Sequence, residues 1–261
     1  MKIYAISYGH YKGCYNDKVV IPIQAGSVLV DTDKIQIKDA GLINISDKNS
    51  TYNELTAIYC VWKNPDLQSP FIGVCHYRRF FVSAKGMDFF FLRLLRKIQL
   101  PKWFLKKTYS YFLSKTTATL LDKSNDIDAI FPSKIKLKIS LREHYCLFHD
   151  STHYEAMMKV IKRDFSYLYD TAEKCSDSCS GYFFNMSILK QDLFNEYCHE
   201  LFKFASLVED ELSYNLPDKK SRYIGYLSER FSSFYFYYLI NQNKISYTEM
   251  NVMLIKSEVY L

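Results

Sequence analysis

The sequence predicts an α/β protein in which a mostly parallel sheet is flanked by helices. Two observations lead to this fold class: short apolar runs recur along the chain, and amphipathic segments with apolar residues at helical spacing separate them. The chain has 261 residues, of which 48% are hydrophobic, so it can bury a sizeable core and a disordered chain is excluded. No repeat and no Pro/Gly/Ser-rich linker divides the sequence, and we expect a single domain over residues 1–261.

Three strands are expected in the first part of the chain. Residues 2–8 predict an opening strand, and residues 19–30 predict a buried strand that is broken at Gly26. The apolar run PFIGVC at 70–75 predicts a central strand of the sheet.

The expected helices and the later strands follow from the same patterns. Apolar residues recur at helical spacing over residues 51–63, and Thr51 and Glu54 fit a capping box at the start of that helix. The later part of the chain predicts strands at 128–133 and 181–189 and helices at 141–170, 190–208 and 222–240.

Several classes of protein are excluded by composition. The glycines are too few and too widely spaced for a Gly-rich dinucleotide fingerprint or a Walker A loop. No run of 18 apolar residues predicts a transmembrane helix, and the N-terminal residues lack the apolar core of a signal peptide. The seven cysteines are odd in number and form no C-x-x-C pair, which indicates free thiols and a cytoplasmic location.

The net positive charge of the chain comes from one segment, residues 85–115. This segment holds eight basic residues and a single acid, whereas the net charge of the chain is +6. Its basic residues are interleaved with Phe, Tyr and Trp, a pattern typical of a basic amphipathic surface element in a membrane interface. Two alternatives are a surface helical hairpin whose aromatic residues pack on the core, and a nucleic-acid-binding patch, which no known motif accompanies. The residues expected to contact the membrane surface are Arg93, Arg96, Lys97, Lys102, Trp103, Lys106 and Lys107.

A basic motif directly follows the predicted central strand. Ligands of open α/β sheets bind beyond the carboxyl ends of the strands, and His76, Tyr77, Arg78 and Arg79 occupy such a position. Two guanidinium groups suit a diphosphate because each can pair with phosphate oxygens. If the strand continues, its alternating side chains place only one of the two arginines in the pocket. The alternative is an ion-pair cluster that braces the edge of the sheet.

A polar loop, NISDKN at 44–49, precedes the first predicted helix. Helix N-termini attract anions, and Ser46, Lys48 and Asn49 add hydrogen-bond donors. Ordinary helix capping explains the same residues equally well.

Two D-x-D triplets supply candidate metal ligands. Asp31 and Asp33, and likewise Asp126 and Asp128, could hold a divalent metal that bridges a nucleotide diphosphate. Loop acids are the simpler interpretation, because a chain with 28 acidic residues contains such triplets readily.

Charged and histidine residues also recur in the predicted helices. His149 and His153 have a spacing used in zinc sites, but without the residues of a zinc-protease motif, and a polar contact from His149 to the acceptor is the favoured interpretation. Glu229 and Arg230 lie on an otherwise apolar helix, where an unpartnered charge is unfavourable. They either brace another buried charge or face a ligand, with Glu229 as general base and Arg230 on phosphate.

Six blocks of the sequence resemble a known bacterial family. In chain order they are IPIQAG, NISDKNSTYNELTAIYCVWKN, IGVCHYRRFF, DAIFP, FFNMSILKQDLFNEYC and RYIGYLSERF. The chain resembles, over residues 2–255, a family of domains of unknown function assigned to capsular polysaccharide and exopolysaccharide glycosyltransferases. That family includes the galactofuranosyltransferase domain of bifunctional O-antigen polymerases.

The resemblance implies transfer of a hexose, such as galactofuranose, from a UDP-linked nucleotide sugar to a lipid-linked glycan acceptor. It also implies a Rossmann-like sheet akin to that of the A-type glycosyltransferases. The family's His-Lys pair after the first strand is replaced here by Tyr8 and Gly9, with His10 and Lys12 beyond. HYRR stands where other A-type enzymes have a metal-binding D-x-D motif, so the sequence does not determine whether Mn²⁺ or Mg²⁺ takes part.

We therefore expect a glycosyltransferase at the inner face of the cell membrane, in capsule, exopolysaccharide or O-antigen synthesis. Glu229 is the first candidate for the general base and Glu54 the second, with Asp128 and Asp33 behind them, while Arg78 leads the cations expected at the leaving diphosphate. The alternative is a non-catalytic nucleotide- or glycan-binding module of a polysaccharide assembly complex. The residues expected to bind the nucleotide sugar are Ser46, Lys48, Asn49, His76, Tyr77, Arg78, Arg79, Asn185, Met186 and Arg230.

Overall fold

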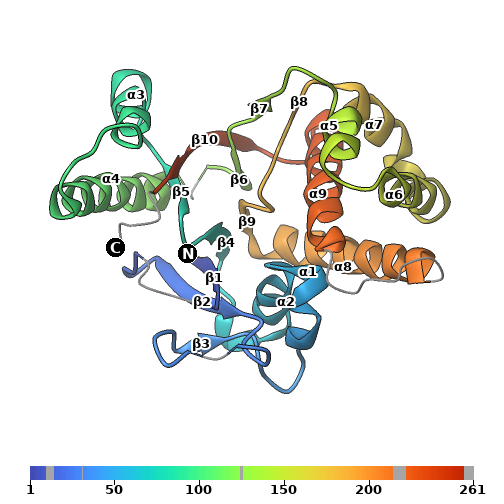
Figure 1. Ribbon diagram of the computed structural model, residues 1–261, viewed down its shortest axis with the longest axis horizontal. Coiled ribbons are helices and arrows are strands. Elements are labelled where there is room, and N and C mark those ends of the chain that lie inside the picture. Colours follow the sequence, from blue (N-terminus) through green and yellow to red (C-terminus); the bar gives the residue numbers. More distant parts are fainter. Residues whose placement is uncertain (10–14, 31, 124–125, 214–221, 256–261) are drawn as a thin grey trace.

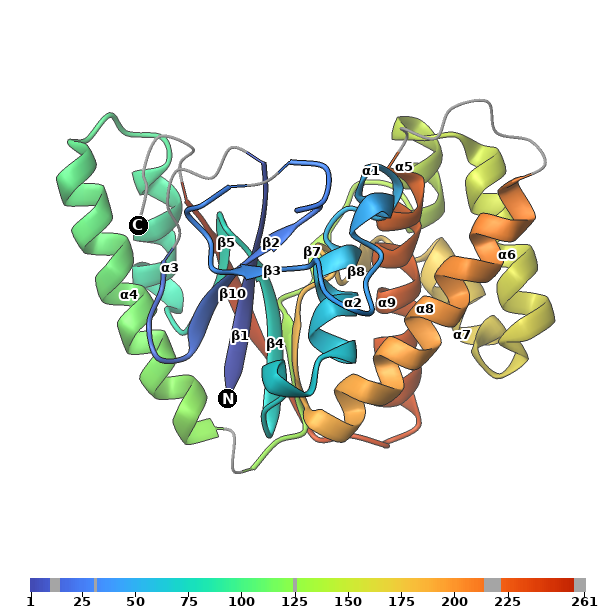
Figure 2. The same ribbon diagram turned by 90° about the horizontal axis from the view of Figure 1, so that it is seen from below.

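The computed structural model describes residues 1–9, 15–30, 32–123, 126–213 and 222–255. These residues form a mixed α/β fold, as the sequence predicts, with an eight-stranded sheet and helices on both of its faces (Figures 1 and 2). None of the helices described is long and apolar enough to cross a membrane.

The sheet has a parallel part and a mixed part. Four parallel strands stand in the order β3-β2-β1-β4: β3 (Ile37–Lys38), β2 (Val20–Ala25), β1 (Lys2–Tyr8) and β4 (Phe71–His76). Beyond them β9 (Ser187–Lys190) is antiparallel to both β4 and β6 (Ala129–Pro132), and β10 (Tyr247–Leu254) is parallel to β6. β5 (Arg79–Val82) is antiparallel to β10 and meets β4 at the pair His76–Arg79. The carboxyl ends of β1, β2 and β4 therefore share one edge.

The larger helical layer covers one face of the sheet (Figure 2). Its centre is aromatic: Phe231 and Phe234 are fully buried, and the Phe231 ring stacks on Phe204 with 4.2 Å between centroids. Burial of each such side chain contributes about 1.5–3 kcal/mol. The layer contains α1 (Asn49–Tyr52), α2 (Leu55–Lys63), α5 (Leu141–Phe148), α6 (Ser151–Asp164), α7 (Ser166–Asp177), α8 (Gln191–Ser213) and α9 (Tyr223–Asn241), with 3₁₀ turns at Ser46–Lys48 and Pro65–Leu67.

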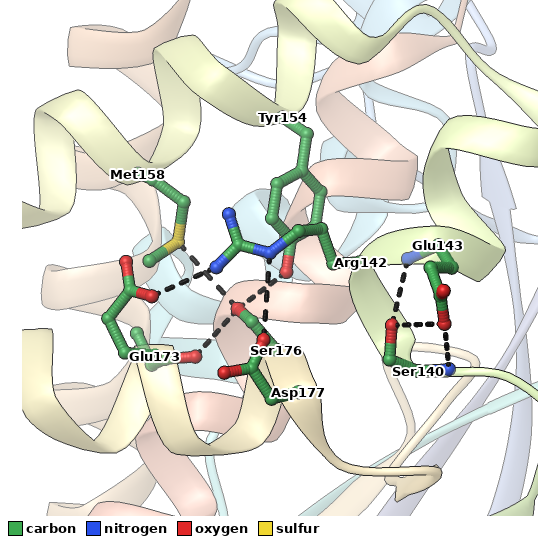
Figure 3. A network of polar contacts seen from close by, with 9 residues as sticks. Ser140, Arg142, Glu143, Tyr154, Met158, Glu173, Ser176 and Asp177 are labelled. Atoms are coloured by element: carbon green, nitrogen blue, oxygen red, sulfur yellow. Dashed lines mark hydrogen bonds and ion pairs between the residues drawn. The ribbon is translucent and has the colours of Figure 1, made fainter.

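A polar network joins three helices of this layer (Figure 3). Arg142 of α5 donates to Glu173 of α7 at 2.9 Å, and its guanidinium lies 5.5 Å from the centroid of the Tyr154 ring of α6. The Tyr154 hydroxyl and the Ser176 hydroxyl of α7 are 2.6 Å apart. A small two-stranded sheet of β7 (Ile135–Lys136) and β8 (Ser180–Gly181) lies beside these helices.

The basic segment forms a helical hairpin on the opposite face of the sheet (Figure 2). It consists of α3 (Gly86–Leu95) and α4 (Lys102–Lys123), which continues past the expected limit at residue 115. Leu95, Leu105 and Tyr109 are buried in the core on this face, whereas Phe90 and Trp103 are 59% and 68% exposed. Part of the aromatic content thus packs on the core, and part remains on the outer surface together with the basic residues.

Two predicted elements are interrupted at a residue with positive φ. The strand expected over 19–30 breaks at Gly26, as predicted: β2 ends at Ala25, and Gly26 has a φ of +64°. The described residues after this break do not resume the strand. The helix expected over 51–63 is split at Asn53, which has a φ of +53°, into α1 and α2. The predicted capping box is wrong, because Glu54 makes no side-chain cap and faces the interior instead.

Candidate active site

A cavity of about 460 Å³ lies at the sheet edge where β1, β2 and β4 end. This edge is where ligands of open α/β sheets bind. The cavity also receives side chains from α1, from the turn before α2 and from one face of α9. Its walls are Ile6, Ser7, Tyr8, Ala25, Asn49, Asn53, Glu54, His76, Tyr77, Arg79, Phe184, Arg222, Tyr226 and Glu229.

The wall beside β2 depends on a close approach at Gly26. A Cβ at this position would lie 2.7 Å from the Asn49 side chain. The Asn49 amide donates to the Asn53 carbonyl at 2.6 Å and to the Thr56 hydroxyl at 3.1 Å. These bonds fix the break between α1 and α2 and so place Glu54 at the cavity wall.

Two carboxylates, Glu54 and Glu229, face this cavity from different elements. The Asn185 amide donates to Glu54 at 2.7 Å and to the Gly225 carbonyl of α9 at 3.2 Å. Asn185 is buried, so it ties the turn before α2 to α9 from beneath the cavity. The side chain is thus a positioning group for the carboxylate rather than part of the cavity wall.

The pKa of Glu229 is raised to about 7. Burial is the main cause, and the negative charge of Glu54 raises the pKa further, whereas Arg230, Arg79 and the backbone N–H of Phe184 act to lower it. A carboxyl with this pKa is partly protonated near neutral pH and can accept or release a proton there.

The segment before β9 adopts a strained backbone at the cavity. Phe184 and Asn185 have φ values of +76° and +49°, a region costing of order 1–3 kcal/mol for residues other than glycine. The Phe184 carbonyl lies 2.5 Å from His76 Nε2, and because a carbonyl oxygen only accepts, Nε2 carries the proton. The Arg79 guanidinium stacks over the Phe184 ring, 4.5 Å from its centroid. Such strain clusters at functional sites.

One face of α9 completes the cavity. Arg222, Tyr226 and Glu229 are spaced by four and then three residues, so they share a helix face. The His149 ring stacks behind Tyr226, with centroids 4.3 Å apart. Burial lowers the pKa of His149, with Arg230, His144 and His153 adding to the effect, so the ring is mainly neutral near pH 7.

Residues 2–244 of the chain match the family DUF4422, a domain of unknown function. The chain belongs to this family. No curated protein matches the sequence.

This DUF4422 domain shares its fold with part of WbbM, a bifunctional glycosyltransferase whose apo structure is known. The two superpose with a TM-score of 0.81 at 22% sequence identity, over 98% of this chain. The chain spans 45% of the length of that WbbM chain.

The HYRR motif lies at the cavity, but its two arginines diverge. His76, Tyr77 and Arg79 line the cavity of the DUF4422 domain. Arg78, the first candidate for the diphosphate, points elsewhere and donates from Nε to the Ile255 carbonyl at 3.3 Å. The strand does not continue through the motif as the alternation argument supposed: β4 ends at His76, Tyr77 and Arg78 form the turn, and Arg79 begins β5. Arg78 is thus a turn residue, whereas Arg79 is held in the sheet.

Two residues of the NISDKN loop support the structure instead of facing the cavity. The Ser46 hydroxyl is fully buried and donates to Asp39 at 2.6 Å, and Asp39 also accepts from the backbone N–H of Gly26 at 2.7 Å. Lys48 forms an ion pair with Glu209 of α8 at 2.7 Å. Asn49 alone among the three predicted residues lines the cavity.

Met186 and Arg230 also lie away from the cavity wall. Met186 is buried in the core between the sheet and α4. Arg230 follows Glu229 on α9 and therefore points to another side of the helix, where it donates to His144 Nδ1 at 3.0 Å and stacks over Phe183. The charged pair of the sequence thus separates into one residue at the cavity and one in the helical layer.

The described residues of the D-x-D triplets belong to no cluster of metal ligands. Within the part of the chain that the structure describes, no three His, Cys, Asp or Glu side chains group as a metal site. Asp128 accepts from Lys190 and Ser246, each at 2.7 Å, which lowers its pKa to about 2, and it precedes β6 at the sheet edge opposite the cavity. Asp33 is exposed outside the cavity wall, while Asp31, His10 and Lys12 fall outside the described residues.

Eight cavity residues were not selected from the sequence: Ile6, Ser7, Tyr8, Ala25, Asn53, Phe184, Arg222 and Tyr226. The first four belong to the ends of β1 and β2. Asn53 could have been identified from the sequence, because asparagine tolerates positive φ and this residue interrupts a predicted helix. Arg222 and Tyr226 precede Glu229 at helical spacing, which would have identified them once Glu229 was selected. Phe184 reaches the cavity through a backbone conformation that no local pattern predicts.

Proposed function

We propose that this domain is a glycosyltransferase. It moves a hexose from a UDP-linked sugar to a lipid-linked glycan acceptor in the synthesis of a bacterial surface polysaccharide. The observation that carries this proposal is the pairing, in one cavity at the sheet edge, of a carboxyl whose pKa is about 7 with the cationic side chains Arg79 and Arg222. The fold shared with WbbM also supports the proposal that this domain is a glycosyltransferase.

Glu229 is the proposed general base. An acceptor hydroxyl oxygen attacks the anomeric carbon of the donor, the bond from that carbon to the diphosphate oxygen breaks, and Glu229 takes the hydroxyl proton. The nucleoside diphosphate leaves with the electron pair. A base whose pKa is near the working pH is deprotonated in a sufficient fraction of the molecules and is still basic enough to accept the proton.

Arg79 and Arg222 are the proposed partners of the leaving diphosphate. Both lie in the cavity wall, and fixed cations near a developing negative charge stabilise the transition state more than the ground state. Asn49, His76 and Tyr77 supply further polar contacts to the donor from the same wall. His149 acts on the acceptor indirectly, by holding Tyr226.

The outer face of α3 and α4 is the proposed contact with the inner face of the cell membrane. Phe90 and Trp103 are exposed there together with Lys97, Lys102 and Lys106. A basic residue near an anionic leaflet contributes about 1 kcal/mol, and the exposed rings add apolar contact.

The test compares wild type with Glu229→Gln. Binding of UDP-hexoses is followed by thermal shift, with and without Mn²⁺ and Mg²⁺, and turnover by release of UDP in the presence of prenyl-diphosphate-linked sugars. A ligand at 100 times its Kd adds about 2.7 kcal/mol to the free energy of unfolding. We expect Glu229→Gln to bind the donor as wild type does and to lose about 10²–10⁴-fold in turnover.

The matched control is Glu155→Gln, which changes an exposed carboxylate on α6. It is expected to retain both donor binding and turnover. Wild-type turnover by Glu229→Gln would remove that residue from the base role. A wild-type protein that binds UDP-sugars but neither transfers nor hydrolyses them would instead be a non-catalytic binding module.

A further inference from the structure

A second cavity of about 520 Å³ adjoins the first and shares Arg79 and Phe184 with it. Its remaining walls come from α3, from the segment 133–136, which includes β7, and from β10. The residues that α3 and its C-cap place in this wall are Phe89, Leu92, Arg93 and Arg96. The basic helix predicted from the sequence therefore borders the candidate active site.

The wall of the second cavity is cationic. It contains Arg79, Arg93, Arg96, Lys134 and Lys136 and no Asp or Glu, whereas the first cavity contains Glu54 and Glu229. Lys134 lies 3.7 Å from Glu249, which is outside the cavity wall.

Three of these cations have no acidic partner in the structure as described. Arg93, Arg96 and Lys136 form no ion pair with another residue of the described ranges. Like charges gathered around one cavity repel one another, and an anion held between them offsets that repulsion. Arginine forks in particular match the oxygens of a phosphate or diphosphate.

The outer side of α3 indicates what kind of molecule the bound anionic group belongs to. Phe90, Phe91 and Leu94 are exposed on the same helix whose Arg93 and Arg96 line the cavity. One helix thus presents cations to the cavity and apolar side chains to the surroundings. This combination suits a ligand that joins a diphosphate to an apolar chain.

We propose that the second cavity binds the diphosphate of a prenyl-diphosphate-linked acceptor. The inference rests on the proposed function and names the acceptor group that the site recognises. With the diphosphate held by Arg93, Arg96 and Lys136, the attached sugar extends past Arg79 and Phe184 toward Glu229. The donor occupies the first cavity, so the two anionic groups bind on either side of Arg79.

The experiment measures calorimetric binding of inorganic pyrophosphate, and of geranylgeranyl diphosphate and geranylgeraniol in detergent micelles. Each titration is done with saturating UDP present, because UDP fills the first cavity. The proteins are wild type, Arg93→Gln with Arg96→Gln, and a control with Lys162→Gln and Lys174→Gln. The control removes two exposed charges from α6 and α7 without touching either cavity.

We expect geranylgeranyl diphosphate to bind wild type more tightly than pyrophosphate does, and geranylgeraniol to bind at least tenfold more weakly. The Arg93/Arg96 variant should lose tenfold or more in affinity for both diphosphates, keep its affinity for UDP and keep its circular dichroism spectrum. The control should match wild type throughout.

Several results would overturn the inference. If pyrophosphate does not bind wild type in saturating UDP, the second cavity is not an anion site. Equal affinity for pyrophosphate and geranylgeranyl diphosphate would show that the prenyl chain is not recognised. A variant that loses only its binding to phosphatidylglycerol vesicles would show a headgroup contact at the surface instead of a cavity site. If wild type does not bind UDP, that result counts against the proposed function. The diphosphate titrations are then run without UDP, and they decide separately whether the second cavity binds anions.

Discussion

The charge of Glu54 contributes to the raised pKa of Glu229, after the larger effect of burial. A second carboxylate beside a buried one favours the protonated form of its neighbour, and this is one cause of the raised pKa of Glu229. Glu54→Gln removes that negative charge while keeping a side chain that can still contact Asn185. We therefore expect the pKa of Glu229 to fall in the variant.

The pH profile of turnover reports this change. A general base works in its deprotonated form, so wild-type kcat/KM should fall as the pH drops below about 7, the pKa of Glu229. In Glu54→Gln the acidic limb should move to lower pH. A limb that moves to higher pH would contradict the assignment of Glu229 as base. A limb that stays in place while activity falls would show that Glu54 has only a structural role.

The adjacent arginines provide a matched pair of variants. Arg79 lines both cavities, whereas Arg78 donates to the backbone of Ile255. A hydrogen bond to a charged group contributes about 1.5–3 kcal/mol, so Arg79→Gln should weaken UDP binding by roughly 10- to 100-fold. Arg78→Gln should leave UDP binding within about twofold of wild type, measured by calorimetry. Equal losses in the two variants would show that the sheet edge, and not a phosphate contact, is what the motif supports.

The position of α9 against the turn before α2 determines the shape of the active-site cavity. A Cβ at Gly225 of α9 would lie 2.7 Å from Nδ2 of Asn53, and the Gly225 carbonyl accepts from Asn185. Gly225→Ala raises helix propensity by about 1 kcal/mol, but it forces Asn53 or α9 to move. We expect UDP binding to weaken at least fivefold even if the thermal midpoint is unchanged.

Gly41→Ala is the control for this substitution. Gly41 has open space at the position of a Cβ, so its alanine variant should bind UDP as wild type does. Unaltered binding by Gly225→Ala would show that the cavity tolerates a shift of α9.

The elements that the sequence predicts well are those in which local pattern and burial agree. β1 follows the run at residues 2–8, β4 follows PFIGVC, and α9 follows the apolar repeat at 222–240, because each buries the face that its pattern defines. Periodicity records that a side chain is buried but not which element covers it. The sequence could therefore select Glu229 but could not separate it from Arg230, since that depends on the rotation of α9.

The same limit explains why two of the predicted loop residues lie away from the cavity wall. Ser46 and Lys48 have the chemistry of anion binders, but their partners are Asp39 and Glu209, neither of which is part of the cavity wall. Strand order is a further property that local pattern does not contain. The antiparallel β9 lies between β4 and β6, and its place brings Phe184 to His76 across 108 positions of sequence.

At the scale of the whole molecule, the fold separates two environments on either side of the sheet. The α3–α4 layer holds the exposed basic and aromatic side chains, and the larger helical layer lies on the opposite face (Figure 2). The second cavity lies between α3 and the active-site cavity. A membrane that contacts the outer side of α3 would thus lie closest to the cavity proposed to hold the acceptor's diphosphate.

Binding to vesicles tests this orientation. Phe90→Ser with Trp103→Ser removes two exposed rings without changing charge, and each ring contributes up to about 1.5–3 kcal/mol when it leaves water. We expect affinity for phosphatidylglycerol vesicles, measured by co-sedimentation, to fall at least tenfold, while UDP binding stays at the wild-type level. Leu42→Ser with Ile43→Ser, which changes two exposed apolar residues between β3 and the Ser46–Lys48 turn, should leave vesicle binding unchanged.

Salt separates the two contributions to this contact. The Debye length falls from about 10 Å at 0.1 M to about 3 Å at 1 M ionic strength, so attraction between the basic residues of α3–α4 and an anionic leaflet should weaken steeply. Wild type should retain a residual affinity at high salt from its exposed rings, and the Phe90/Trp103 variant should retain none. If both proteins dissociate alike, the rings do not enter the membrane, and charge alone holds the domain at its surface.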